Sequence, residues 1–555
     1  MDQKAIFTYC QSLGCCKLCC LRYAGIRNPN AYEKPNDFCK KFESDNRTEQ
    51  DQNNMDSEPK EDVNGREHAP ENSTTHNDKS NGNGNEALSE NSNDNGCPAP
   101  KRRKMDVCAS CLGILQEQTW SDSVEMTKEV LEKKRYECKT FACALSAPIA
   151  TILREKTIML RLIDKYPEYS QQTLIPLKEA WKWSFGVYLE SNINKTLDSG
   201  AISPLLITVN MDYIDDLQEL EILKTVSPEL FEERSKQKRR FVTEFTRRSV
   251  EQALENATLS TLVAAGGALP VAAGPAHTAG VQAAHAPAYL AARYVKLSRN
   301  LPQSPWVLEG RRVLPSSVQE IIFAPIAKLY KFDADAAESR LKFVAAGRED
   351  VDVRCLGDGR PFAVEITDPT RELTAAELEQ VCEEISKSGD VVVKTFQPIT
   401  RDDLVQLKKG EETKCKTYEA VCIKLSHRDD ENLPEDAPIT VTDTDIERMN
   451  AFRNTAADDV IKLNIQQKTP IRVLHRRPLL TRTRQILDFT AEKVTGQQQL
   501  FKIRVRTSAG TYVKEWVHGE FGRTRPALGE AIGARVDMLA LDVTAVHLDW
   551  PPNKS

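Results

Sequence analysis

Hydrophobic positions recur with two different spacings along this chain and predict a mixture of helices and strands. Helical spacing covers residues 126–139, 229–257, 318–329 and 511–521, the second as one long basic helix and the last with Thr511 near its N-cap. Alternating or continuous apolar runs predict strands at 205–209, 289–296, 361–366, 418–426, 500–506 and 539–550. This mixture is typical of an α+β fold.

One short stretch, Gly347 to Arg354, combines this pattern with candidate chemistry. Apolar and charged residues alternate through its second half, which predicts a half-buried strand entered through small residues at 345–347. Asp350 lies in it close to Arg348 and Arg354, and a nearby cation keeps an aspartate ionised, which suits a nucleophile. The alternative is an ordinary strand start with surface charges.

Two segments lack a folding pattern and predict the domain boundaries. Residues 41–100 are rich in Asn, Asp, Glu, Ser and Gly and almost free of aromatic residues, which predicts a disordered acidic insert. Residues 261–288 are mostly Ala, Gly, Val, Pro and His and predict a flexible linker. We therefore expect one domain formed by 1–40 and 101–260, and a second at 289–555, as the length of 555 residues allows.

The distribution of charge leaves a polyanionic partner open. The chain has a net charge of −6, but residues 41–100 alone hold 14 acidic and 5 basic residues. Residues 468–484 carry six Lys or Arg residues and no acid, a fair footprint for nucleic acid. The run 101–104 is a nuclear localisation patch or simply a solvated charge run. With no secretion signal and no long apolar span, we expect a soluble protein of the nucleus, the cytoplasm or both.

Two Cys-x2-Cys pairs predict a metal site. Cys16 and Cys19 form one pair and Cys108 and Cys111 the other, and this spacing points two thiolates at one tetrahedral ion. We expect structural zinc at these four residues. The tandem cysteines leave Cys15 or Cys20 open as a replacement ligand, and four unrelated buried thiols are the other alternative.

Three motifs resemble those of the pseudouridine synthases and occur in that family's order. Gly-Arg-Glu-Asp at 347–350 resembles the motif around the nucleophilic aspartate, Lys416-Thr417-Tyr418 the motif of the active-site tyrosine, and Gly-Thr-Tyr-Val-Lys at 510–514 the motif of the basic residue that pairs with the aspartate. Residues 298–303, 347–361, 467–478, 521–524 and the two cysteine pairs resemble, more narrowly, the Pus-ten family of archaeal and eukaryotic tRNA pseudouridine synthases.

This resemblance implies a fold and a reaction. It implies a C-terminal pseudouridine synthase fold with a mixed, largely antiparallel sheet and helices, and an N-terminal zinc-bearing, THUMP-containing α/β domain that binds RNA. The reaction would isomerise uridine to pseudouridine at positions 54 and/or 55 of the tRNA TΨC arm, an intramolecular transfer without a redox or nucleotide cofactor. Asp350 would be the nucleophile, Tyr418 would stack on the uracil and Lys514 would keep the aspartate charged. Attack by the carboxylate and a glycal route both stay open.

The same reading assigns RNA contacts and partners. Residues expected to bind RNA are Arg299, Arg348, Lys468, Arg472, His475, Arg476 and Arg477. The expected partner is tRNA, with other structured RNA as a further possibility; we expect a monomer and no membrane partner. The alternative functions are a non-catalytic RNA-binding factor in small-RNA processing and a zinc-scaffold adaptor that binds protein.

Overall fold

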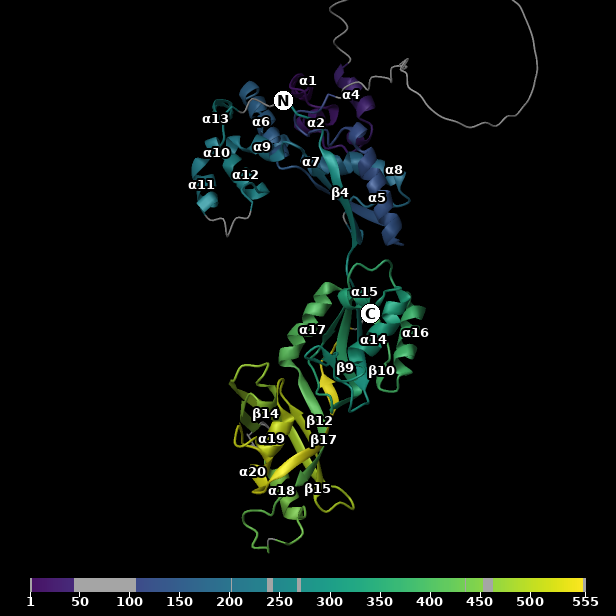
Figure 1. Cartoon of the computed structure of the whole chain (residues 1–555), viewed down its shortest axis with the longest axis vertical. Coiled ribbons are helices and arrows are strands. Elements are labelled where there is room, and N and C mark those ends of the chain that lie inside the picture. Colours follow the sequence, from purple (N-terminus) through teal and green to yellow (C-terminus); the bar gives the residue numbers. More distant parts are fainter. Residues whose placement is uncertain are drawn as a thin grey trace, which may run out of the picture. The chain divides into compact units, whose positions relative to one another are not determined.

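The computed structural model describes residues 2–43, 106–200, 202–236, 243–266, 271–434, 436–452 and 463–552. The predicted acidic insert at 41–100 and the basic run 101–104 lie almost wholly outside the described residues. The chain forms two compact units (Figure 1): the first comprises 1–129, 143–199 and 207–282, the second 130–142, 200–206 and 283–555. No helix in the described part of the chain is both long and apolar enough to cross a membrane.

The first unit is mainly helical around a four-stranded sheet with strand order β2-β1-β3-β4. Its strands are β1 (Thr140–Ser146), β2 (Thr196–Leu197), β3 (Leu205–Asp212) and β4 (His277–His285). The larger helices are α1 (Gln3–Ser12), α2 (Lys17–Tyr23), α4 (Pro35–Glu43), α5 (Ser121–Lys134), α6 (Ala150–Lys165), α11 (Pro228–Lys236), α12 (Arg247–Leu254) and α13 (Leu259–Ala264). Shorter helical segments are α3 (Asn30–Glu33), α7 (Leu177–Trp181), α8 (Val187–Asn192), α9 (Asp216–Leu220) and α10 (Ile222–Val226).

Two sequence predictions for this unit are wrong. The long basic helix expected over 229–257 is divided into α11 and α12, because Thr246 caps the second helix by accepting from the Ser249 amide. The linker expected over 261–288 contains the end of α13 and all of β4. Alanine-rich strands pair through their backbones, so the weak hydrophobicity of 277–285 hid a strand.

The second unit is built on a sheet whose described strands number eleven, largely antiparallel. Its main path runs β10-β5-β9-β17-β12-β15-β14-β13-β16, and β9, β17 and β12 run along the middle of the unit (Figure 1). The strands are β5 (Ala288–Lys296), β8 (Leu341–Ala345), β9 (Arg354–Ile366), β10 (Val391–Val393), β11 (Gln397–Ile399), β12 (Cys415–Lys424), β13 (Leu463–Lys468), β14 (Thr481–Lys493), β15 (Leu500–Thr507), β16 (Thr524–Arg525) and β17 (Val536–His547). A separate ribbon pairs β6 (Val307–Leu308) with β7 (Arg311–Arg312).

This unit has two large hydrophobic cores, and a smaller third cluster packs residues of β5 and β9 against Leu404 and Leu407. One lies around β5 and β9 under α14 (Val318–Leu329) and α16 (Ala375–Ser386); the other lies around β12, β15 and β17 under α19 (Val513–His518) and α20 (Leu528–Ile532). The remaining helices are α15 (Ala334–Arg340), α17 (Arg401–Thr413) and α18 (Asp443–Ala451). The two cores meet where β17 pairs with β9 in parallel, Asp542 opposite Arg354 and Val543 opposite Cys355. The mixed α+β class expected from the sequence is confirmed.

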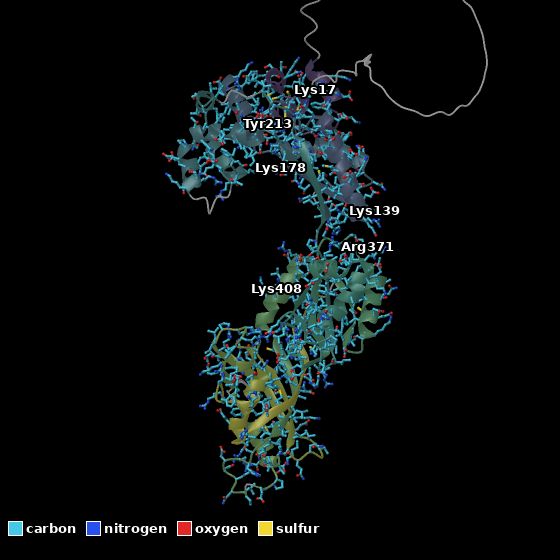
Figure 2. All side chains as sticks on the ribbon, viewed as in Figure 1. Lys17, Lys139, Lys178, Tyr213, Arg371 and Lys408 are labelled. Atoms are coloured by element: carbon cyan, nitrogen blue, oxygen red, sulfur yellow. The ribbon has the colours of Figure 1, made fainter. Side chains whose placement is uncertain are left out.

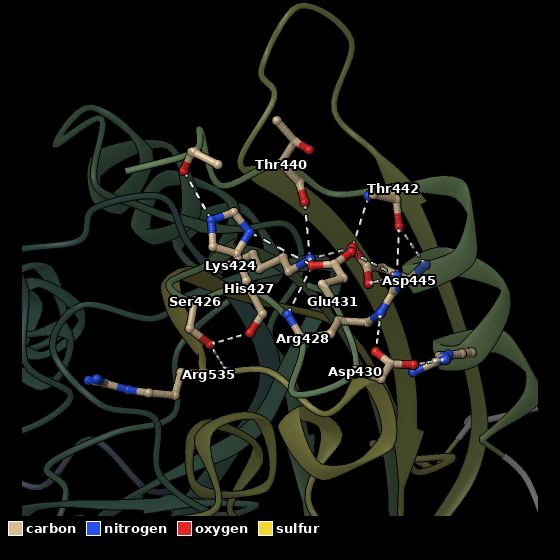
Figure 3. Close-up of polar contacts among 12 residues, drawn as sticks. Lys424, Ser426, His427, Arg428, Asp430, Glu431, Thr440, Thr442, Asp445 and Arg535 are labelled. Carbon is tan, nitrogen blue, oxygen red and sulfur yellow. Dashed lines mark hydrogen bonds and ion pairs between the residues drawn. The ribbon is translucent and has the colours of Figure 1, made fainter. Parts of the chain in front are cut away.

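A buried ionic network fixes the second core (Figure 3). Lys424 Nζ lies 2.8 Å from Asp445 Oδ2, and their side chains are 1% and 0% exposed. Arg428 Nη1 donates to the other oxygen of Asp445 at 3.2 Å, and the Thr442 amide donates to Asp445 at 2.9 Å. Because every charge here has a partner, α18 is held against the sheet by satisfied polar groups as well as by apolar contacts.

Candidate active site

A cavity of about 830 Å³ opens in the second unit, where its two cores meet. Most of its lining comes from the loop before β9, the start of β12, residues 472–484, and residues 510–514 at the start of α19, and β8 and β17 contribute further residues. Asp350, Tyr418 and Lys514 all line this cavity, so the structure brings together the three residues expected to be catalytic. Phe343, Val353, Val473, Leu541 and Val543 form part of its apolar wall.

Asp350 lies on a loop and not on the strand that alternation predicted. The Val353 amide donates to the Asp350 carbonyl at 3.1 Å in a turn, and β9 begins only at Arg354. Gly347 begins the loop with φ +86°, a backbone conformation that glycine adopts readily and residues with a Cβ adopt only at an energetic cost. The buried ammonium of Lys296 donates to the carbonyls of Asp350 (3.2 Å) and Val351 (2.8 Å). These bonds fix the loop backbone beneath the carboxylate.

Neighbouring acids on this loop have opposite environments. Glu349 points inward, with a side chain 1% exposed, and accepts from Tyr294 at 2.8 Å while Arg360 Nε lies 2.7 Å away. Asp350 points into the cavity and its side chain is 34% exposed. Glu349 therefore anchors the loop from within, whereas the neighbouring carboxylate of Asp350 is accessible from the cavity.

Two cations approach Asp350 at different distances. Arg472 Nη1 lies 2.9 Å from Asp350 Oδ2, and its Nε lies 2.7 Å from Glu515 Oε1, a carboxylate that is 2% exposed. Lys514 Nζ lies 3.9 Å from Asp350 but 2.7 Å from Asp352. The pKa of Asp352 is lowered because the hydrogen bond and charge of Lys514 outweigh burial. Asp350 and Asp352 thus share the ammonium of Lys514, which lies closer to Asp352.

Strand β12 supplies the third side of the cavity. Its alternation brings Lys416 and Tyr418 to the same lining surface, and Lys414, which directly precedes the strand, lines the cavity beside them. Burial raises the pKa of Tyr418 to about 12, so its phenol stays protonated at neutral pH. Burial, with the charges of Arg360 and Lys414, lowers the pKa of Lys416 to about 7. Lys416 thus lines the cavity although it was not among the expected site residues, and its place in the Lys-Thr-Tyr motif is the signal that could have indicated it.

The expected RNA-binding residues divide into three groups. Arg348, Arg472, Arg476 and Arg477 line the cavity, joined by Arg482 and Arg484, which the basic run contained but the sequence analysis did not single out. Lys468 and His475 are exposed outside its lining. Arg299 is not brought to the cavity: its Nη2 lies 2.6 Å from Asp542 Oδ1, and its Nη1 donates to the carbonyls of Asp352 and Leu541.

The four predicted cysteine ligands converge in the first unit. The sulfur atoms of Cys16, Cys19, Cys108 and Cys111 all lie within 4.8 Å of one another, and Cys16 and Cys111 are 3.8 Å apart. Tetrahedral zinc with bonds of about 2.3 Å requires sulfur separations of about 3.8 Å, so the donor set fits. Lys17, labelled in Figure 2, follows Cys16 and begins α2, which carries Cys19 round one turn. Cys15 and Cys20 are outside this group.

Comparison with known proteins identifies similar chains for both units. The family model described as "Pus10, C-terminal" matches residues 289–547, and "Eukaryotic Pus10, N-terminal" matches 108–265. The chain is 33% identical over 466 residues to "tRNA pseudouridine synthase Pus10" of Homo sapiens, covering 82% of this chain and 81% of the relative. A "Putative tRNA pseudouridine synthase Pus10" of Drosophila melanogaster is 32% identical over 82% of this chain and 86% of its own length.

Archaeal relatives match a shorter part. "tRNA pseudouridine synthase Pus10" of Methanocaldococcus jannaschii is 33% identical over 273 residues, 47% of this chain and 53% of the relative. Among solved structures, a Cbf5-Nop10-Gar1 complex matches 46% of this chain and 58% of that chain at 16% identity with a TM-score of 0.21.

Proposed function

The chain belongs to the Pus10 family, and from this we propose that it is a tRNA pseudouridine synthase, an isomerase that converts uridine to pseudouridine. The observation that carries the proposal is the carboxylate of Asp350, which faces a cavity also lined by Tyr418 and is 2.9 Å from a guanidinium. The guanidinium of Arg472 is paired with this carboxylate and stabilises its negative charge. The substrate positions are uridines 54 and/or 55 of the TΨC arm.

The reaction requires the C1′–N1 bond to break, the uracil to turn, and a C1′–C5 bond to form, while C5 loses its proton and N1 gains one. Asp350 supplies the anion, either by attack on the sugar or base or by removing a sugar proton to give a glycal. Arg472 and Lys514 stabilise this anion, and the protonated phenol of Tyr418 lies against the uracil ring. The cavity admits the uridine only after the base leaves its stack, at a cost of a few kcal/mol.

Arginines around the cavity offset this cost by binding phosphates. Arg348, Arg476 and Arg477 are exposed side chains at the cavity, and Arg482 and Arg484 lie beside them. Phosphate contacts of this kind position RNA without reading its sequence. These five arginines therefore explain how an open cavity binds the polyanionic RNA.

The first unit is proposed to bind RNA as a THUMP-containing domain stabilised by structural zinc at Cys16, Cys19, Cys108 and Cys111. Four thiolates leave no open coordination position, so the zinc would hold the fold together and take no part in the chemistry. The enzyme would work as a monomer on tRNA inside the cell.

One experiment tests the catalytic proposal. Full-length protein is incubated with unmodified tRNA transcript, and pseudouridine is mapped on the product. Wild type should modify the TΨC arm, whereas Asp350→Asn should give no product and bind the RNA with nearly unchanged affinity, because phosphate contacts lie elsewhere. RNA binding without product from wild type would support the non-catalytic RNA-binding factor, and turnover by Asp350→Asn would refute the nucleophile.

A further inference from the structure

Phe521 is a large aromatic side chain held in water by an unfavourable backbone. It is 96% exposed, the most exposed aromatic residue among the large hydrophobic side chains that the structure describes as exposed. Glu520 and Phe521 have φ of +42° and +55°, and Gly522 follows with φ +77°. Non-glycine residues in this region cost about 1–3 kcal/mol each and persist where surrounding contacts determine them. A strained backbone that places an aromatic ring in solvent indicates that the ring contacts a ligand.

Glu520 supplies the contacts that fix this turn. It is 7% exposed, and its amide donates to His518 Nδ1 at 3.1 Å. Its carboxylate accepts from the Ile471 amide at 2.9 Å and from Arg523 Nε at 3.2 Å. The ring of Phe521 is therefore presented from a rigid base rather than from a loose loop.

Two chains of contacts connect the turn to the cavity. Ile471 directly precedes Arg472, whose guanidinium binds Asp350. On the other side, Gln467 Nε2 donates to Thr524 Oγ1 at 3.2 Å and to the Tyr512 carbonyl at 2.9 Å, and Tyr512 lines the cavity. The exposed ring thus stands on the same framework that positions the reactive carboxylate.

Exposed cationic side chains stand on the residues beside this turn. Arg525 is 70% exposed; its Nε lies 3.4 Å from Glu530 Oε1, and its Nη2 would lie 3.1 Å from a Cβ at Gly522. Lys468 is exposed, and its amide donates to the Arg523 carbonyl. Single-stranded nucleic acids bind to surfaces of this kind, on which exposed aromatic rings stack with unpaired bases while nearby cations contact the phosphates.

We propose that Phe521 is a stacking platform for an unpaired base of the RNA substrate, next to the nucleotide that enters the cavity. The inference rests on the proposed function for the identity of the substrate, an RNA loop. A base that flanks the extruded uridine loses a stacking neighbour, and the phenyl ring replaces that neighbour. The contact is independent of base identity, since every base presents a π-face.

The test measures binding of the full-length protein to an unmodified tRNA transcript, and to the same transcript with 2-aminopurine beside the target uridines. Phe521→Ala should raise the Kd for the tRNA by about 5- to 150-fold, the range for removal of a stacking aromatic. It should also abolish the quenching of 2-aminopurine fluorescence that wild type causes. Phe521→Trp should retain both. Leu433→Ala, at a side chain 52% exposed in the same unit, is the matched control and should change neither.

The outcomes are separable from failure of the proposed function. Asp350→Asn should bind and quench like wild type while giving no pseudouridine, so stacking is read without turnover. Wild-type Kd and quenching in Phe521→Ala would overturn the proposal. Equal losses in Phe521→Ala and Phe521→Trp would also overturn it, because a larger ring should stack at least as well. Since the ring is exposed, the melting temperature of each variant should match wild type.

Discussion

Arg472 Nη1 lies 2.9 Å from Asp350 Oδ2, a full ångström closer than the ammonium of Lys514, which contacts Asp352 more tightly. The closer cation comes from the basic run that the sequence assigned to RNA phosphates. Its geometry is fixed from behind by the buried carboxylate of Glu515. Arg472 is thus held by a carboxylate on each side, and it fixes the position of Asp350 Oδ2 in the cavity.

Arg472→Met should therefore slow isomerisation more than Lys514→Met does. Loss of a hydrogen bond to a charged group is worth about 1.5–3 kcal/mol, or about 10- to 150-fold in rate. The measurement is single-turnover pseudouridine formation at saturating tRNA, which separates the step from binding. Arg472→Lys, as the matched control, should recover part of the rate. A larger loss in Lys514→Met would return the principal role to the lysine.

Arg476→Ala combined with Arg477→Ala should weaken tRNA binding and flatten its salt dependence. Both side chains are exposed at the cavity, and each lost phosphate contact should reduce the slope of log K against log salt by about 0.7–0.9. The matched control is Lys408→Ala with Lys409→Ala, two exposed lysines on α17. An unchanged slope in the arginine variant would show that these side chains make no phosphate contact.

Cys108→Ser combined with Cys111→Ser should release zinc and lower the melting temperature of the first unit, because metal binding energy is folding energy at such sites. Metal analysis of protein purified without chelator should give about one ion per wild-type chain. Cys15→Ser and Cys20→Ser should retain the ion, since their sulfur atoms are outside the group of four. Zinc loss in either control would show that the ligand set includes a tandem cysteine.

Asp445→Ala should destabilise the second unit by about 3–5 kcal/mol, because the charge of Lys424 would stay buried without its closest partner. Burial opposes ionisation of Asp445, but hydrogen bonds from Lys424, Thr442 and Arg428 outweigh it and lower its pKa below 3.8. The stabilisation is therefore complete at neutral pH and is lost as the pH falls through the folded-state pKa. Calorimetry at pH 7 and in acid checks both statements.

Asp430→Ala is the matched control for this pair. Asp430 is 52% exposed and binds Arg428 and Arg448 at the surface, so its removal should destabilise the unit far less than removal of Asp445, because exposed ion pairs contribute little to stability. Equal losses in the two variants would mean that burial of the ion pair adds nothing to stability.

The long elements of the second unit could be predicted because burial there follows element periodicity. The helix expected at 318–329 has the same bounds as α14. The strand expected at 500–506 is confirmed as β15, which extends one residue further, to Thr507. Thr511 was expected near the cap of a helix to 521; α19 instead runs from Val513 to His518, because Gly519 adopts a left-handed conformation. Local pattern gives the element, while the turn that ends it depends on a single residue.

The site was predictable only as far as short motifs carry it. Three motifs gave Asp350, Tyr418 and Lys514, which line one cavity. The contact between Arg472 and Asp350 joins residues 122 positions apart, and no local pattern distinguishes an arginine that binds a carboxylate from one left for phosphate. Residues 347–353 were predicted to form a strand for a related reason. Apolar and charged residues alternate in a strand, but they also alternate in a loop when some side chains hold it to the core and others face the cavity.

The seam between β9 and β17 divides the cavity-lining residues between the two sides of the second unit. Asp350 precedes β9 on one side, while Tyr418, Arg472 and Lys514 come from the segment that follows α17. Neither half of the second unit contains a whole site. Under the proposed function, catalysis therefore depends on the two halves staying packed together, so a substitution that loosens the pairing of β9 with β17 would lower activity without touching a cavity side chain.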